Sequence, residues 1–112
     1  MNKNKKTFNL TNELMGYFFD LGIEDIQIKI NNNHDDVKIS IWGVIEDFSL
    51  KQIEDLELSL NTPRETQVEG YYFELTGNSS HIHELPLVGM MTDKAEVKYE
   101  DDQLEITVQR RD

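Results

Sequence analysis

The sequence contains no cysteine among its 112 residues. This excludes a disulfide scaffold, a thiol nucleophile and thiolate metal ligands. No apolar run approaches the roughly 20 residues that a membrane-spanning helix needs. The basic start, MNKNKKTFNL, also lacks the apolar stretch of a signal peptide. We therefore expect a soluble, cytoplasmic protein, and the length predicts one domain over residues 1–112.

Positive charge is scarce, since 11 Lys and Arg stand against 22 Asp and Glu, for a net charge of −11. Five of the eleven lie near the two ends, and residues 1–7 are expected to form a flexible basic tail. Between Thr7 and Gln109 the balance is 6 basic to 21 acidic residues. Such a body repels nucleic acid and anionic membranes. The expected partner is a protein, either one of basic character or a second copy in a homodimer.

Four segments alternate between apolar and polar residues, which is typical of strands with one buried and one solvated face. They are Asp25–Ile30, Val37–Trp42, Ala95–Glu100 and Leu104–Gln109. Turn-forming residues join the first two segments (NNNHDD) and the last two (Asp101-Asp102). The pattern predicts two hairpins in a mainly antiparallel sheet of about four strands.

Helices are expected to cover one face of this sheet. Thr11–Leu21 carries an apolar stripe at helical spacing and ends at Gly22. A second helix begins at Ser49, where Gln52 completes a capping box. The apolar residues of both helices are assigned to the layer between sheet and helices. In the first helix they are Leu14, Met15, Phe18, Phe19 and Leu21, and in the second Leu50, Ile53, Leu56, Leu58 and Leu60. The predicted fold class is α+β, a two-layer sandwich.

Between the second helix and the second hairpin the pattern is less regular. Glu65–Leu75 fits a strand as well as a helix, because Gly70 interrupts a run rich in aromatic residues. Thr76–His83 is polar and predicts a loop. A short helix is expected over Glu84–Thr92, with a proline in its first turn.

No catalytic residue is predicted. The serines lie outside any nucleophile elbow, and no phosphate-binding glycine pattern occurs. His81, His83 and Glu84 have ligand atoms suited to a metal. Alternate residues of a polar loop need not converge, so solvated side chains are the preferred interpretation. The predicted cofactor set is therefore empty.

Candidate interaction residues are Trp42, Lys29 and Lys98, all expected on the outward face of the sheet. An exposed Trp is a frequent binding hot spot, although Trp42 is equally suited to capping an edge of the core. Lysines make this face less negative than the rest of the chain, so it is the expected docking face of a homodimer, with a neighbouring edge strand as the alternative.

The stretch Leu85–Val97, followed by a turn and a strand, resembles the C-terminal end of the histidine-kinase-like ATPase (GHKL) superfamily. It is most similar to the anti-sigma-factor serine kinases, whose last helix runs to an Asp just before a strand, here Asp93. The segment Gly43–Phe48 occupies the place of the family's Asp-x-Gly-x-Gly-Phe turn. Over residues 8–110 the resemblance implies a kinase-like frame that binds partner proteins.

The family's nucleotide contacts are altered in this chain. Glu13 is followed four positions on by Tyr17 where the family has a magnesium-binding Asn. Gly43 stands in place of the Asp that reads adenine. The two glycines after that Asp correspond to Ile45 and Asp47, and only Phe48 agrees. The family's glycines that approach the phosphates, before its last helix, correspond to residues around Ile82 and Glu84. The resemblance thus implies a shortened frame without a nucleotide.

We predict a non-catalytic protein-interaction or regulatory module. Two alternatives stay open. One is a nucleotide-binding anti-sigma-type serine kinase with rewired contacts, and the other is a metal-responsive protein that uses His81 and His83.

Overall fold

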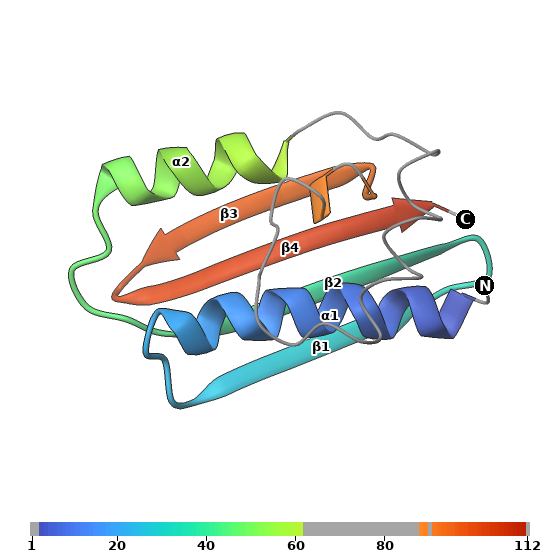
Figure 1. The fold of residues 1–112 in the computed structure, drawn as a ribbon, viewed down its shortest axis with the longest axis horizontal. Coiled ribbons are helices and arrows are strands. Elements are labelled where there is room, and N and C mark those ends of the chain that lie inside the picture. The colour runs from blue at the N-terminus through green and yellow to red at the C-terminus, as the bar shows by residue number, and fades with distance from the viewer. Residues whose placement is uncertain (1–2, 62–87, 90, 112) are drawn as a thin grey trace.

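A computed structural model describes residues 3–61, 88–89 and 91–111. Two helices and four strands are assigned within these residues (Figure 1). In chain order they are α1 (Lys3–Asp20), β1 (Ile26–Asn32), β2 (Asp36–Val44), α2 (Leu50–Leu60), β3 (Lys94–Glu100) and β4 (Gln103–Arg111). The expectations for 64–83 and for most of the short helix lie outside the described residues. Within these residues, neither helix is both long and apolar enough to cross a membrane.

The four strands form one antiparallel sheet in the order β1-β2-β4-β3, which confirms the α+β class and fits the two predicted hairpins. Asn33 closes the first hairpin, its backbone N–H donating to the carbonyl of Asp36 over 2.9 Å. The second turns at Asp101 and Asp102, whose φ angles are +52° and +62°. Aspartate tolerates this left-handed region better than most residues, which is why it is common in two-residue hairpin turns.

The core lies on one side of the sheet. Along β2 and β4 every second residue is buried, among them Val37, Ile39 and Ile41 of β2, whereas the residues between them are at least partly exposed. Figure 1 shows α1 in front of the β1–β2 half of the sheet and α2 alongside β3. In agreement with this view, α1 contacts β2 and α2 contacts β3.

The first helix is longer than its apolar pattern predicted. It begins at Lys3 rather than near Thr11, so residues 3–7, which were expected in an N-terminal tail, belong to α1. Thr7 is buried, and its carbonyl accepts a hydrogen bond from the Thr11 hydroxyl. Residues Leu10, Leu14 and Phe18 recur every four positions and line the core. The helix ends at Asp20, and the chain turns at the expected Gly22, whose φ is +84°.

The capping box predicted for the second helix is present. The Ser49 hydroxyl accepts from the backbone N–H of Gln52 over 3.1 Å, and the Gln52 side chain accepts from the backbone N–H of Ser49 over 2.9 Å. Two side chains assigned to its apolar stripe, Leu50 and Leu58, are instead exposed. Only Leu56 and Leu60 of α2 are fully buried, because they are the residues that face the sheet.

A short connection before the second hairpin packs against the end of α2. Of the described residues in the predicted short helix, Val88 and Gly89 are helical and buried, whereas Met91 and Thr92 are not helical. A Cβ on Gly89 would meet the Leu60 carbonyl oxygen at 2.7 Å, so only glycine allows this approach. Arg110, near the end of β4, packs against the same connection, and its buried guanidinium donates to the carbonyl of Met91 over 2.8 Å. Arg110 is therefore part of the core side of β4.

Candidate functional site

The sequence-predicted interaction residues share the outer sheet face. Trp42 of β2 is half-buried and stands opposite Glu105 of β4, which stands opposite Lys98 of β3. Lys29 of β1 is exposed one row away, opposite Ser40. The three side chains are thus spread over three strands. They line no common cavity among those found in the described residues.

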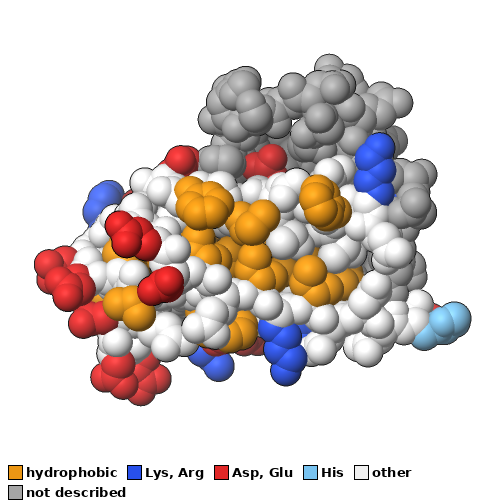
Figure 2. All heavy atoms as spheres, turned by 90° about the horizontal axis from the view of Figure 1, so that it is seen from below, with side chains coloured by type: hydrophobic (Ala, Val, Ile, Leu, Met, Phe, Trp, Pro, Cys, Tyr) orange, Lys and Arg blue, Asp and Glu red, His pale blue; other side chains and the backbone are white. Residues whose placement is uncertain are grey.

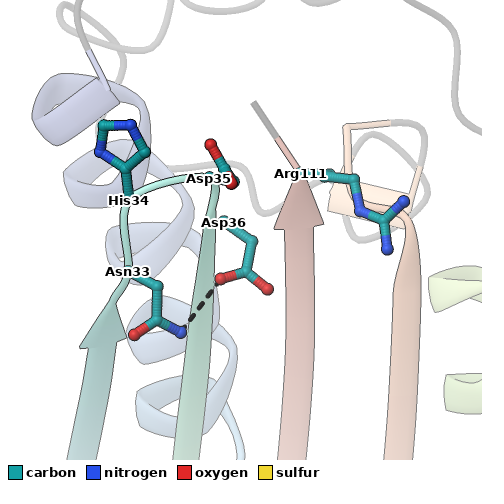
Figure 3. Close-up of a pocket in the computed structure, with 5 residues that line it drawn as sticks. All are labelled: Asn33, His34, Asp35, Asp36 and Arg111. Carbon is teal, nitrogen blue, oxygen red and sulfur yellow. Dashed lines mark hydrogen bonds between the residues drawn. The ribbon is translucent and has the colours of Figure 1, made fainter.

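An open hollow of about 660 Å³ lies between the β1–β2 turn and the end of β4 (Figure 3). Asn33, His34, Asp35, Asp36 and Arg111 line it. The Asp36 carboxylate accepts from the Asn33 amide over 3.0 Å and from the Gln109 amide over 2.7 Å. In Figure 3 the Arg111 guanidinium points away from the two carboxylates. Asp36 is thus engaged in holding the turn against β4.

Metal ligation finds no support in the part of the chain that the structure describes, since no group of three His, Asp or Glu side chains there is placed to hold an ion. His81, His83 and Glu84, the predicted candidates, lie outside the described residues. His34 lines the hollow of Figure 3 but has no such companions.

An apolar surface lies where α1 meets the edge strand β1. We call it the α1–β1 apolar surface and define it by Phe8, Met15 and Phe19 of α1 with Ile26, Ile28 and Ile30 of β1. Phe8 is 66% exposed, Phe19 61% and Ile30 44%, and the other three are partly buried. Figure 2, seen from the side on which β1 lies in Figure 1, shows hydrophobic side chains gathered over these elements.

This surface exists because α1 packs over β2 and not over the edge strand β1. Ile30 and Ile39 are register partners on the same inner face, yet Ile39 of β2 is 1% exposed. Since α1 packs on β2, the neighbouring strand receives only partial cover. On the helix, Phe8, Met15 and Phe19 follow each other at spacings of seven and four residues, which places them in one stripe beside the core residues.

Sequence reasoning missed this surface. It assigned Met15 and Phe19 to the core stripe and did not consider Phe8. A signal was present, because Leu10, Leu14 and Phe18 already complete one face of the helix, and Phe8 and Phe19 fall on another. The pattern gave no indication of which of the two stripes faces the sheet.

The two edges of the sheet differ in charge. On its outer face β3 carries Lys94, Glu96, Lys98 and Glu100, with an ion pair of 3.5 Å between the first two. None of the large hydrophobic side chains exposed in the described residues belongs to β3. Within β1, by contrast, Lys29 is the single charged residue. Its outer edge has no strand beside it within the described residues.

Two positions that correspond to nucleotide contacts in the GHKL resemblance have side chains or surroundings unsuited to that role. Burial raises the pKa of the Tyr17 phenol above its usual value near 10, so Tyr17 is a neutral, half-buried group. At Gly43 a Cβ would meet Cγ2 of Ile23 at 2.6 Å and the carbonyl oxygen of Asp25 at 2.9 Å. The space that an adenine-reading carboxylate needs is therefore occupied.

No protein-family model matches the chain, and no significant match is found among curated proteins.

Proposed function

We propose that this chain is a non-catalytic, cytoplasmic protein-interaction or regulatory module that docks its partner on the α1–β1 apolar surface. The observation that carries the proposal is the exposure of three large apolar side chains, Phe8 and Phe19 of α1 and Ile30 of the edge strand β1. Large apolar side chains gathered on one surface are typical of binding sites, and aromatic residues contribute much of the energy of such contacts.

The frame proposed for this module is a degenerate histidine-kinase-like ATPase. Its support is the order of elements, a helix and a hairpin, a second helix, then a second hairpin, which is the order on which the resemblance rests. The filled space at Gly43 supports a frame that has lost its nucleotide.

Site-specific cross-linking tests the docking surface. A photoreactive phenylalanine analogue placed at Phe19 in living cells is expected to capture a discrete partner, and Phe8→Ser is expected to reduce that capture. The matched control places the analogue at Leu58, which is 75% exposed on α2. Equal capture from both positions, or capture from neither, contradicts the proposal.

Calorimetry with Mg-ATP tests the kinase alternative. We expect no binding heat, because a carboxylate cannot occupy position 43 without displacing Ile23 or the Asp25 backbone. A micromolar dissociation constant would overturn the proposal and favour a nucleotide-binding kinase. For the metal-responsive alternative, zinc would have to raise the melting temperature, and His81→Ala and His83→Ala would have to remove that rise.

A further inference from the structure

We infer that the partner docked on the α1–β1 apolar surface is a second copy of this chain, joined edge to edge along β1 into one continuous antiparallel sheet. This inference rests on the proposed function and names its partner. Strand β1 is at one end of the order β1-β2-β4-β3, so within the described residues no strand pairs with its outer edge, and a strand from another molecule can add there. Its seven residues are long enough for such pairing.

Charge and exposed apolar area allow a second copy to dock at β1. The chain carries a net charge of −11, so two copies repel each other over most of their surface. Strand β1 contains no acidic residue and one lysine, so this repulsion is weaker where two β1 strands meet than over the acidic remainder of the surface. Of the two edge strands, β1 alone has an exposed large hydrophobic side chain among the described residues, that of Ile30.

A two-fold axis at Ile28 makes the pairing self-complementary. In antiparallel pairing about this point, Ile26 faces Ile30 of the partner subunit and Ile28 faces its own symmetry mate. Inner faces then meet inner faces, as a shared core requires. Shifting the axis to Lys29 would instead set two lysines directly opposite each other, which is destabilising.

The same register places charges on the outer face. Lys29 stands opposite Gln27 of the partner subunit, with Asp25 and Lys29 of the partner subunit at its two diagonals. Asp25 directly precedes β1 and is exposed. A diagonal neighbour in a sheet is within reach of a long side chain such as lysine. The attraction between Lys29 and the partner's Asp25 occurs twice in the symmetric dimer.

The dimer also completes the helical layer. Paired strands lie about 4.8 Å apart, and helices pack at about 8–10 Å. Because α1 packs over β2 (Figure 1), three strand spacings, about 14 Å, separate the two α1 helices of the dimer, and they meet through the large side chains of the α1 stripe rather than at direct packing distance. The half-covered face of β1 and the stripe containing Phe8 and Phe19 would then be enclosed together (Figure 2).

A charge-swap series measured by sedimentation equilibrium tests the partner and the register. The wild-type chain is expected to show twice its mass of 13.1 kDa in the micromolar range. Lys29→Glu or Asp25→Lys alone should weaken the dimer about tenfold, because two attractions become repulsions. The double variant, Lys29→Glu with Asp25→Lys, should restore most of the wild-type affinity. Lys98→Glu, the same change on the other edge strand, is the matched control and should have little effect.

One result would contradict the homodimer, and a different result would contradict the β1 interface. A wild-type chain that stays at 13.1 kDa throughout the micromolar range overturns the homodimer. A dimer that responds to Lys98→Glu but not to Lys29→Glu overturns the β1 interface. Circular dichroism of every variant checks that the fold is kept.

Cross-linking at Phe19 separates failure of this inference from failure of the proposed function. A monomeric chain that still captures a different protein at Phe19 rejects the second copy but keeps the interaction module. A monomer that captures nothing rejects both. If Phe8→Ser and Phe19→Ser destabilise a monomer as strongly as core substitutions do, the surface is covered within the chain and the dimer is also rejected.

Discussion

Gly43 is the residue at which β2 comes closest to the segment that follows α1. A Cβ there would lie 2.6 Å from the Ile23 side chain and 2.9 Å from the carbonyl oxygen of Asp25, and a backbone carbonyl cannot move aside as a flexible side chain can. The missing side chain thus lets the turn between α1 and β1 pack directly on the sheet.

We expect Gly43→Ala to lower the free energy of unfolding by about 1–3 kcal/mol, the usual cost of overpacking a core. Gly43→Asp should cost more, because it adds a charge beside Ile23 and Phe18. Urea denaturation followed by circular dichroism measures both. Ser40→Ala, on the outer face of the same strand, is the control and should stay within roughly 1 kcal/mol. Equal effects at positions 40 and 43 would contradict the close approach.

The Tyr17 phenol makes stability depend on pH in the alkaline range. Burial raises its pKa in the folded protein above the usual value near 10, so the folded state holds the phenolic proton more tightly than the unfolded chain does. Its contribution is therefore fully present below pH 10 and is lost as the pH rises through the folded-state value. We expect Tyr17→Phe to remove this contribution to the loss of folding stability at alkaline pH.

The measurement compares urea unfolding of the wild type and Tyr17→Phe at several pH values from neutral to alkaline. Only the difference between the two proteins reports on Tyr17, because other tyrosines and the lysines titrate in the same range. Parallel declines in both proteins would show that Tyr17 titrates alike in the folded and unfolded states.

At the scale of elements, the two central strands carry the core and the edge strand β1 carries an incompletely covered face. Inner-facing residues of β2 and β4 are buried throughout, whereas those of β1 are half-buried or exposed. The difference follows from position, because a central strand has a neighbour on each side and a helix above it. An edge strand beneath an offset helix lacks part of that cover.

Alanine substitutions should show the difference in burial between the central strands and the edge strand β1. Ile106 in β4 is 0% exposed, and Ile106→Ala should cost about 2–5 kcal/mol. Ile28→Ala should cost about half as much in the monomer, because Ile28 is only partly buried at the sheet edge. Lys29→Ala and Thr107→Ala should each cost roughly 1 kcal/mol or less. Urea unfolding at a protein concentration low enough to keep the chain monomeric gives all four values. Equal losses at Ile106 and Thr107 would mean that both faces of the sheet are covered.

At the scale of the whole molecule, the excess of negative charge opposes both compaction and self-association. A net charge of −11 on 112 residues places many carboxylates within a Debye length of one another at low ionic strength. The described ion pair between Lys94 and Glu96 is on the surface and offsets little of this repulsion.

We expect added salt to raise the midpoint of thermal unfolding. Most of the rise should come below about 0.2 M NaCl, because the Debye length falls from about 30 Å at 0.01 M to about 8 Å near 0.15 M. Differential scanning calorimetry with NaCl and with choline chloride should give the same curve if screening is the cause. A rise that continues linearly to 1 M, or that depends on the salt chosen, would point to preferential exclusion from the surface instead.

The local structure followed closely from the sequence. Alternation of isoleucine and valine with polar residues located all four strands to within three residues at each end. Ser49, Gln52 and Gly22 located the start of α2 and the end of α1. These features depend on hydrogen bonds and backbone preferences within a few residues, which a sequence pattern records directly. The start of α1 was missed because Lys3, Lys5 and Lys6 resemble a tail but are good helix formers.

The candidate site was not determined in the same way. Alternation along each strand was enough to place Trp42, Lys29 and Lys98 on one outer face. The packing of α1 on β2, which leaves β1 half-covered and so exposes Phe8 and Phe19, could be seen only in the folded chain. The physical reason is that periodicity gives the direction of each side chain about its own element, whereas exposure depends on where a distant element sits. That position is set by long-range contacts, such as the fit of Ile23 against Gly43.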